Sequence, residues 1–451
     1  MDLFEQGAGL AHDRPRFPPM KSDEGTIPLL THRMNHVVFL IVTALAALVI
    51  ASTALAASEA SPRQIWIATW AASPQAADTD SDDPLVKIEG QTVRERVRIS
   101  IGGAQIRVRL SNEYGLTPLV IESATVALPS DATSVKPGSI KSLTFGGRSS
   151  VTIPTGAPLL SDPIALRVAP GAEVSISLYF PQRVSTPTLH ALALKRAVVT
   201  PRGDFTHADH VETQGVSESS ILISAVLIPA RPGQRLLVAF GDSITDGDAS
   251  TVDADGTWPS DLARRLAKRA SCPAVAVVNE GIAGNRLLAN GFGISALARF
   301  DRDVLTLPGV THVVLLEGVN DLGFLGAKLN GRDLADPSEA RTVNDLIGAY
   351  IQLIARAHAR GIRIIGATLT PFEGAAIPGY YSETKEAARQ AINAWIRTSG
   401  TFDGVIDFDA VLRHPKHPSR MQTRYVSHDH LHPTDVGYQA MADAIDPSLF
   451  R

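Results

Sequence analysis

The chain has 451 residues, of which 44% are hydrophobic and 20% are charged, and its formal net charge at pH 7 is −4. This length allows two or three domains with cores of ordinary size. With 42 basic against 46 acidic residues and no long basic run, the composition argues against nucleic acid as a partner. The only cysteine, Cys272, excludes an internal disulfide and a metal site built on cysteines. We interpret Cys272 as a small apolar residue at a helix end.

The N-terminal region has the pattern of an export signal. An apolar run over 37–51, broken only by Thr43, continues into Ala54-Leu55-Ala56, which fits a small-x-small cleavage site. We predict a leader over 1–33, whose role the sequence leaves open, and a signal peptide over 34–57. An uncleaved membrane anchor is the alternative, since about twenty apolar residues can span a bilayer. Both interpretations predict export to the periplasm or the extracellular space, with membrane contact only for the uncleaved anchor.

Residues 58–230 have the pattern of an antiparallel β domain. Short runs alternate apolar and polar residues, as over 96–101 (Arg-Val-Arg-Ile-Ser-Ile), and turns rich in Gly and Pro separate these runs. Such alternation is typical of strands with one face in the core and the other in water. It predicts a mostly antiparallel, jelly-roll-like β-sandwich. The segment 229–234 (Pro-Ala-Arg-Pro-Gly-Gln) is the predicted linker to the next domain.

Three aromatic residues of this region, Trp66, Trp70 and Tyr114, have two interpretations. They could form a platform on which sugar rings stack, or they could belong to the core or to an interface. Because aromatic residues dominate cores, the second interpretation is favoured.

Residues 231–451 change to alternating strands and helices. Apolar runs predict strands over 236–240, 274–278, 313–316, 362–368 and 405–408. Helical patterns predict helices over 258–270, 295–305, 343–354, 387–396 and 433–445. This alternation predicts a parallel sheet covered by helices on both faces, which is a three-layer α/β/α arrangement.

Four groups of residues follow the predicted strands. Ser243 follows the first strand, Gly284 the second and Asn320 the third, and the block Asp-His-Leu-His-Pro at 429–433 comes after the fifth. A parallel sheet gathers the loops at the carboxyl ends of its strands along one edge. We therefore expect these four groups to converge on one site.

The residue types in these groups suit nucleophilic catalysis. Ser243 would be the nucleophile, and His432 would take its proton as general base and return it to the leaving alcohol. Asp429, three residues before His432, can reach the other imidazole nitrogen and fix the tautomer. The backbone amides of Ser243 and Gly284, with the side-chain amide of Asn320, would form an oxyanion hole. Each such donor can be worth about 10²–10³ in turnover.

Neighbouring histidines leave alternatives open. His430 competes with His432 as the base, although the spacing to Asp429 favours His432. His430 is otherwise a candidate substrate contact. Its closeness to His428 and His432 raises the question of a metal site, but no carboxylate-histidine ligand pattern accompanies them, and we predict none.

Other polar residues also have two interpretations. Asp407 and Asp409 are expected near the same edge, and either could replace Asp429 as the acid that orients the base. Asp242 and Asn285, which flank the nucleophile and the oxyanion glycine, are candidate substrate contacts. Gly284 could instead serve only tight backbone geometry, and Asn320 could serve only a turn.

The four blocks resemble those of the SGNH hydrolases, also called GDSL hydrolases, a superfamily of serine esterases. The resemblance covers roughly 235–446, with the blocks in the family's order. The matching segments are Gly-Asp-Ser at 241–243, Gly284-Asn285, Gly-Val-Asn-Asp at 318–321 and Asp-His-Leu-His-Pro at 429–433. Each block is a weak signal singly, and their order makes the combination specific.

The resemblance implies a carboxylic ester hydrolase that uses neither a metal nor an organic cofactor. The region 58–230 also looks like the β-domain of some secreted bacterial members. We therefore expect a β-sandwich domain over 58–230 and an SGNH hydrolase domain over 231–451.

These observations predict an exported serine esterase that works through an acyl-enzyme. The expected substrates are short-chain acyl esters such as acetyl esters, with acetyl groups on a polysaccharide as one candidate. A lipase or lysophospholipase is one alternative, and an acyltransferase using the same serine is another. From a different class, the chain would be a carbohydrate- or surface-binding protein with an inactive hydrolase domain. The sequence specifies no oligomeric state.

Overall fold

The structure, a computed structural model, describes residues 64–268 and 274–451. The predicted leader, the predicted signal peptide or anchor, and Cys272 lie outside these residues. Gln64–Arg451 belongs to one compact unit. Among the described helices, none has both the length and the hydropathy that crossing a membrane requires.

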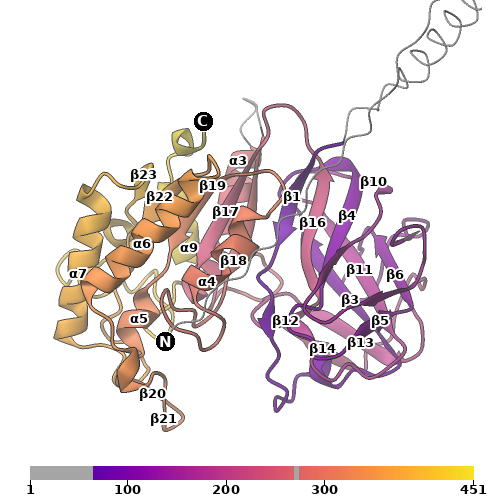
Figure 1. The fold of residues 1–451 in the computed structure, drawn as a ribbon, viewed down its shortest axis with the longest axis horizontal. Coiled ribbons are helices and arrows are strands. Elements are labelled where there is room, and N and C mark those ends of the chain that lie inside the picture. The colour runs from indigo at the N-terminus through magenta and orange to yellow at the C-terminus, as the bar shows by residue number, and fades with distance from the viewer. Residues whose placement is uncertain (1–63, 269–273) are drawn as a thin grey trace, which may run out of the picture. The chain divides into compact units, whose positions relative to one another are not determined.

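The first part of this unit is a mostly antiparallel β-sandwich, as the sequence predicts (Figure 1). Its main strands are β1 (Trp66–Ala71), β3 (Gln91–Arg98), β4 (Gly103–Ser111), β6 (Ser123–Ala127), β7 (Lys141–Ser142), β9 (Pro158–Leu160), β10 (Ile164–Val168), β11 (Glu173–Phe180), β13 (Ala197–Arg202), β14 (Gly215–Ser217) and β16 (Ile223–Pro229). One sheet has the order β1-β16-β4-β10, with β9 beside β4, and the other has the order β14-β13-β3-β11-β6-β7. A separate pair joins β5 (Leu119–Ile121) to β8 (Val151–Ile153).

A small third sheet lies on the side of the sandwich that faces the second half of the chain (Figure 1). It has the order β15-β12-β2, with strands β2 (Gln75–Ala76), β12 (Thr188–His190) and β15 (Ser220–Ile221). A short 3-10 helix (Pro84–Lys87) follows β2 in the sequence.

The polar face of β3 is not in water, in contrast to the prediction. Arg96 donates a hydrogen bond to Asp253 at 3.0 Å, and Arg98 donates one to Asp255 at 2.6 Å. Both aspartates belong to the second half of the chain. Alternation of apolar and polar residues reports two different surroundings, and here the polar surroundings are an acidic loop rather than solvent.

The second part is built on a parallel sheet, which confirms the predicted α/β class. Its strands are β17 (Arg235–Gly241), β18 (Val275–Gly281), β19 (Val310–Leu316), β22 (Arg363–Ala367) and β23 (Gly404–Ile406). The order is β18-β17-β19-β22-β23, so the chain moves from β17 first to one side and then to the other. The strand order therefore reverses at β17, and such a switch point leaves a crevice at the carboxyl ends of the strands.

Helices cover both faces of the sheet (Figure 1). They are α2 (Ser243–Asp246), α3 (Trp258–Ala267), α4 (Ala296–Phe300), α5 (Val319–Gly323), α6 (Val343–His358), α7 (Glu383–Thr398), α8 (Phe408–Leu412) and α9 (Asp435–Ala444). Helices α3, α8 and α9 pack together, and α4, α6 and α7 form the other group.

Several predicted boundaries shift. The helix predicted over 295–305 is α4 followed by a π-helical turn (Asp301–Leu305). The strand predicted over 405–408 stops at Ile406, because Asp407 caps α8 by accepting a hydrogen bond from the N–H of Ala410. The remaining short elements are the hairpin β20 (Lys328–Leu329) and β21 (Arg332–Asp333) and the 3-10 helices Pro337–Glu339 and Pro447–Phe450.

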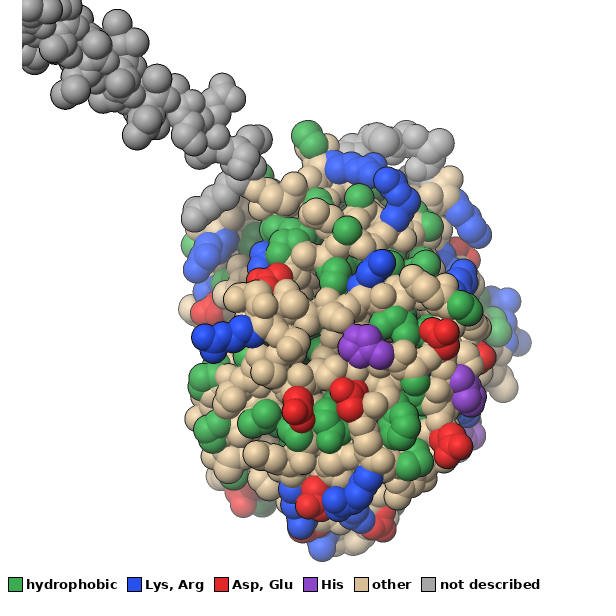
Figure 2. Space-filling model, turned by 90° about the vertical axis from the view of Figure 1, so that its right-hand side faces the viewer, with side chains coloured by type: hydrophobic (Ala, Val, Ile, Leu, Met, Phe, Trp, Pro, Cys, Tyr) green, Lys and Arg blue, Asp and Glu red, His purple; other side chains and the backbone are tan. Residues whose placement is uncertain are grey.

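The face seen in Figure 2 carries basic and acidic side chains scattered among uncharged ones. No extended patch of one sign is visible on this face. This view agrees with the small net charge of the sequence.

Candidate active site

The nucleophile predicted from the sequence lies at the carboxyl end of β17, at the switch point of the sheet. Ser243 is the first residue of α2, a single turn capped by Asp242, whose side chain accepts a hydrogen bond from the N–H of Ile244 at 3.0 Å. The N–H of Gly247 closes the turn on the carbonyl of Ser243. Ser243 is 5% exposed, so it is largely buried.

The structure brings Ser243, His432 and Asp429 into one hydrogen-bonded chain. The Oγ of Ser243 lies 2.8 Å from the Nε2 of His432, and the Nδ1 of His432 lies 2.6 Å from an oxygen of Asp429. The other oxygen of Asp429 accepts from the backbone N–H groups of Leu431 and His432 and from the hydroxyl of Ser427. Asp429 is thus held in place, and it holds the imidazole with Nε2 turned to the serine.

The electrostatics of the three groups suit proton transfer from the serine. Burial alone would raise the pKa of Asp429, but its hydrogen bond and charge interaction with His432 outweigh burial and lower it. Burial alone would lower the pKa of His432, but Asp429 and the nearby carboxylates of Asp248 and Asp242 raise it above its ordinary value. The imidazolium formed during catalysis would therefore be stabilised.

Gly284 lies beside this chain in a conformation that favours glycine. Its φ is +72°, and a Cβ atom there would lie 2.5 Å from the ring of Phe292. On either side, the N–H of Ala283 is bound to Asp246 and the N–H of Asn285 is bound to the carbonyl of Ile282. The close approach of backbone and ring at Gly284 explains why a side chain is excluded there.

Asn320 is oriented by a residue that the sequence did not single out. The hydroxyl of Tyr380 donates to the Oδ1 of Asn320 at 2.7 Å, which fixes the Nδ2 as the donor end of the amide. One Nδ2 hydrogen goes to the carbonyl of Asn285 at 2.9 Å, and the amide has a second hydrogen. Burial raises the pKa of Tyr380 well above its ordinary value, so the phenol stays a donor. No spacing in the sequence connects Tyr380 to Asn320.

Two predicted substrate contacts have buried side chains with structural partners instead. Asn285 is 1% exposed, donates to the carbonyl of Ile294 and accepts from Arg299. Asp242 is also 1% exposed and serves as the cap of α2. Burial raises the pKa of Asp242 to about 7. These side chains support the site from below, and a substrate could not reach them.

Asp321, next to Asn320, also supports the site. Its carboxylate accepts from the backbone N–H groups of Leu287 and Leu288 at 2.6 and 3.0 Å. It thereby ties the loop that follows β18 to the loop that follows β19. Burial raises the pKa of Asp321 to about 6.

The opening of the site carries polar side chains. Asp248 places an oxygen 3.7 Å from the Nε2 of His432, and its side chain is 41% exposed. His430 is exposed and has a φ of 58°, and it is not part of the hydrogen-bonded chain through Ser243. His432 is therefore the histidine placed to act as base, and His430 remains a candidate substrate contact.

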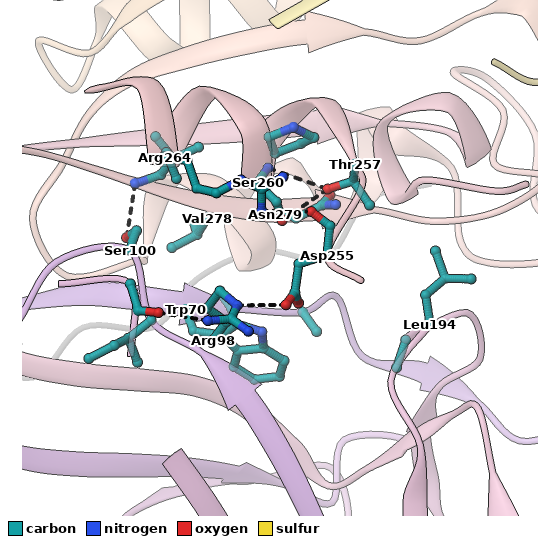
Figure 3. A pocket seen from close by; sticks show the side chains of 18 of the residues that line it. Trp70, Arg98, Ser100, Leu194, Asp255, Thr257, Ser260, Arg264, Val278 and Asn279 are labelled. Atoms are coloured by element: carbon teal, nitrogen blue, oxygen red, sulfur yellow. Dashed lines mark hydrogen bonds and ion pairs between the residues drawn. The ribbon is translucent and has the colours of Figure 1, made fainter. Parts of the chain in front are cut away.

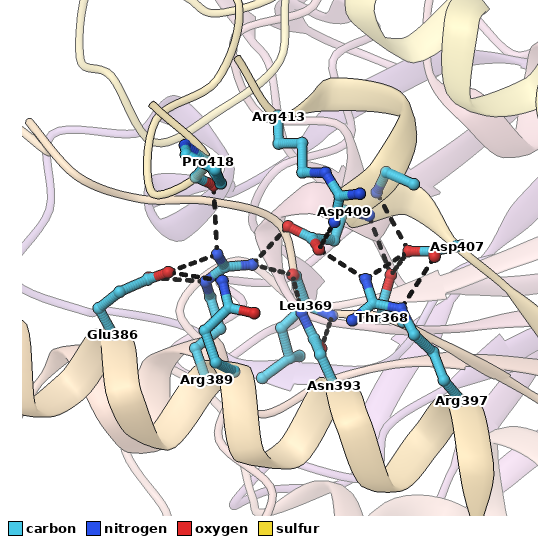
Figure 4. A network of polar contacts seen from close by, with 12 residues as sticks. Thr368, Leu369, Glu386, Arg389, Asn393, Arg397, Asp407, Asp409, Arg413 and Pro418 are labelled. Atoms are coloured by element: carbon cyan, nitrogen blue, oxygen red, sulfur yellow. Dashed lines mark hydrogen bonds and ion pairs between the residues drawn. The ribbon is translucent and has the colours of Figure 1, made fainter. Parts of the chain in front are cut away.

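Asp407 and Asp409 lie in a separate ionic network (Figure 4). Asp407 binds Arg397, and the fully buried Asp409 binds Arg389, Arg397 and Arg413. Neither is the acid on His432, because Asp429 occupies that position. The three arginine partners of Asp409 explain how this carboxylate can be fully buried.

The three aromatic residues considered as a sugar platform belong to interfaces and cavity walls. Arg107 covers the ring of Trp66, and Arg302 covers the ring of Tyr114 and donates to its hydroxyl. Trp70 lines a cavity of about 290 Å³ between the sandwich and the parallel-sheet part, together with Arg98 and Asp255 (Figure 3). Ser243 is not among the residues that line this cavity.

Within the described residues, no group of three or more His, Cys, Asp or Glu side chains is arranged to hold a metal ion. His428, His430 and His432 are close in sequence, but the ring of His432 is bound to Ser243 and Asp429.

The comparisons with known proteins agree with the resemblance found in the sequence. Residues 239–440 match the GDSL-like Lipase/Acylhydrolase family. A comparison with curated proteins gives no match.

Several solved structures are similar to about half of the chain. A GDSL-like lipase from Bacteroides thetaiotaomicron VPI-5482 is 19% identical, with a TM-score of 0.35, over 48% of this chain and 88% of that one. An aryl esterase from M. smegmatis is 14% identical, with a TM-score of 0.35, over 47% and 95%. A carbohydrate acetylesterase from Sinorhizobium meliloti is 14% identical, with a TM-score of 0.34, over 47% and 95%.

Replacing Asp248 tests the electrostatics of the opening. A base must be unprotonated, so ester hydrolysis should rise with pH through the pKa of His432, above about 6.5. Asp248→Asn removes a negative charge that favours the imidazolium, so the acidic limb of the kcat/KM profile should move to lower pH. We expect a shift of roughly 0.2–0.7 pH units, because partly exposed ion pairs are worth about 0.2–1 kcal/mol. Asp333→Asn, at an exposed hairpin, is the control and should leave the limb in place.

A pair of isosteric changes separates the two acidic sites. Asp429→Asn should lower kcat by about 10⁴-fold, because the imidazole loses the partner that sets its tautomer. Asp409→Asn should leave kcat within about 2-fold but lower the free energy of unfolding by about 3–5 kcal/mol, because the buried Arg389 loses one of its two carboxylate partners. Initial rates and urea unfolding measure both. The assignment of Asp429 fails if the two variants lose kcat equally.

Proposed function

We propose that the chain is a carboxylic ester hydrolase that cleaves short-chain acyl esters with Ser243 as nucleophile, because residues 239–440 match the GDSL-like Lipase/Acylhydrolase family. One observation carries the catalytic assignment. The Ser243–His432–Asp429 chain is hydrogen-bonded throughout, and Ser243 follows β17 at the switch point of the sheet, between the two strands that precede Gly284 and Asn320.

The proposed reaction has two halves. The Oγ of Ser243 attacks the ester carbonyl carbon while its proton passes to the Nε2 of His432. His432 then returns that proton to the leaving alcohol oxygen, and an acyl-enzyme remains on Ser243. A water molecule, deprotonated by His432, attacks the acyl carbon and releases the acid and the serine. Asp429 stabilises the imidazolium in both halves.

The oxyanion of each tetrahedral intermediate would lie against the N–H groups of Ser243 and Gly284 and the Nδ2 of Asn320. Tyr380 supports this role, because its hydroxyl presents the donor end of the Asn320 amide. Donors fixed in advance require no reorganisation as charge develops on the oxygen.

The surroundings of Gly284 support a short acyl group. Because His432 protonates the leaving oxygen, the alcohol must lie on the His432 side and the acyl group on the opposite side. We assign the acyl side to the surroundings of Gly284, where the ring of Phe292 packs and the ring centroids of Phe292 and Phe324 are 5.9 Å apart.

The alcohol side is polar, which supports a hydroxyl-rich leaving group such as a sugar. Asp248 lies 3.7 Å from the Nε2 of His432 with a partly exposed side chain, and the exposed His430 is two residues before His432 in the chain. The export signal predicted over 34–57 would place the enzyme where polysaccharides occur. We propose acetyl esters of a carbohydrate as the natural substrate class.

The direct test is initial-rate hydrolysis of 4-nitrophenyl acetate by the full chain, compared with Ser243→Ala. We expect turnover by the wild type and a loss of roughly 10⁶-fold in the variant, at the level seen when a catalytic serine is removed. Equal activity in both proteins would mean that Ser243 is not the nucleophile. Mass spectrometry of the wild type quenched with substrate should show the acyl group on the Ser243 peptide.

The size of the acyl site can be tested at Phe292, which is 51% exposed and can be truncated with little effect on folding. The wild type should prefer C2 and C4 esters to C8. Phe292→Ala should raise the C8-to-C2 ratio of kcat/KM by at least about 10-fold, since space for one or a few methylenes is worth about 1–3 kcal/mol. Leu116→Ala, at an exposed position of the sandwich, is the matched control. An unchanged ratio would place the acyl group elsewhere.

A further inference from the structure

A buried histidine–aspartate pair connects the β-sandwich to the nucleophile turn. His190, at the end of β12, lies with its Nε2 3.0 Å from an oxygen of Asp246, the last residue of α2. The His190 side chain is 8% exposed and that of Asp246 is 2% exposed. The pair therefore joins the two parts of the chain with little exposure, in the wall of the cavity of about 290 Å³.

The hydrogen bonds of His190 define the proton content of the pair. Its Nδ1 lies 3.0 Å from the carbonyl oxygen of Ser73, which can only accept, so Nδ1 carries a hydrogen. The Nε2 and Asp246 then share one further proton. Burial alone would lower the pKa of His190, but the charge of Asp246 raises it, whereas burial raises the pKa of Asp246 itself, so the shared proton is held between the two groups.

Asp246 contacts both the turn that carries Ser243 and the loop that carries Gly284. It stands one helical turn after Ser243, and its second oxygen accepts from the N–H of Ala283 at 2.9 Å, directly before Gly284. The turn also packs closely on β18, because a Cβ on Gly281 would lie 2.3 Å from the backbone nitrogen of Asp246. A movement of Asp246 would thus shift the nucleophile and the oxyanion glycine together.

A second connection runs through Ser73, in the same part of the sandwich. Its hydroxyl donates to Glu280 at 2.6 Å and accepts from Arg299 at 3.0 Å. Arg299, which is fully buried, also donates to the carbonyl of Gly241 at 2.8 Å, two residues before Ser243. The carbonyl of Ser73 is the acceptor of His190, so both connections share this residue.

A third connection links the sandwich to Phe292, which we assign to the wall of the acyl site. Gln75, in β2, donates to the backbone carbonyl of Phe292 at 2.8 Å. Its Oε1 accepts from the N–H of Ala191, which directly follows His190. The small sheet of β2 and β12 is therefore the part of the sandwich that contacts the catalytic loops.

We infer that the β-sandwich is part of the catalytic unit, and that His190 is a positioning residue that acts through Asp246 on Ser243 and Gly284. This inference rests on the proposed function, since it assigns what holds that site. It also gives the sandwich a role that does not require binding a polymer.

Two amide substitutions at His190 test the inference in the full chain. Asn can place an amide near Nδ1 and keep the bond to Ser73, whereas Gln can place one near Nε2 and keep donation to Asp246. We expect His190→Asn to lower kcat for 4-nitrophenyl acetate by roughly 10–100-fold with KM changed less than about 2-fold, because small misplacements of reacting groups cost up to about 10²-fold. His190→Gln should stay within about 3-fold of the wild type. His210→Asn, an exposed histidine of the sandwich, is the control.

A double variant tests whether His190 acts through Asp246. His190→Asn combined with Asp246→Asn should lose no more kcat than the more impaired single variant, because both remove one interaction. Losses that multiply would contradict the inference. It is also overturned if His190→Asn matches His210→Asn in kcat, or if His190→Asn and His190→Gln lose activity equally and in proportion to their loss of thermal stability.

Labelling with a fluorophosphonate probe separates this inference from the choice of substrate. Phosphonylation of Ser243 requires the nucleophile and the oxyanion hole but no natural ester. The second-order labelling rate should fall in His190→Asn and be largely kept in His190→Gln, even if short acyl esters are not the substrates. A labelling rate that is the same in the wild type and His190→Asn would overturn the inference.

Discussion

The guanidinium of Arg299 is the group on which the carboxyl edge of the sheet depends. It is fully buried and donates to the carbonyls of Gly241 and Glu280, which end β17 and β18. It also binds Asp303 at 3.0 Å and stacks on the ring of Phe240. A buried cation is costly unless it is paired and fully hydrogen-bonded, so these partners must keep their places. The ends of two adjacent strands are thereby fixed relative to each other. Ser243 and Gly284 come shortly after these ends in the sequence, so their relative positions are constrained as well.

The sandwich extends this constraint beyond the parallel sheet. Ser73 accepts from Arg299, and Arg302 donates to the carbonyl of Pro74, so one loop of the sandwich caps the buried charges. The pairs formed by Arg96 and Arg98 with the acidic loop lie further along the same interface. Because these contacts include fully desolvated polar groups, separating the two parts would expose several of them at once. This accounts for the single compact unit formed by Gln64–Arg451.

The sequence predicts those features that depend on local order. Ser243, Gly284 and Asn320 follow buried strands, and their meeting at one edge is a consequence of parallel topology. Asp429 and His432 are three residues apart, so their contact could also be predicted. Tyr380, Arg299 and His190 could not be found in this way, because each acts on a residue 14 to 60 positions away with no periodic pattern between them. The arginine face of β3 was wrongly placed in water, since alternation does not distinguish solvent from an acidic partner.

Buried carboxyl groups near the site would oppose an oxyanion if they were ionised, and burial reduces this effect by raising their pKa values. Asp242, Glu280 and Glu317 are buried near a place where negative charge would develop on an oxyanion. Burial raises the pKa of Asp242 to about 7 and that of Glu280 to about 8, and it raises that of Glu317 well above its ordinary value. At neutral pH these carboxyl groups are therefore in large part protonated and uncharged. The positive charge of Arg299 offsets part of the negative charge that remains. The acid that must stay ionised, Asp429, lies on the other side of the imidazole, where its charge favours the imidazolium and His432 separates it from the oxyanion.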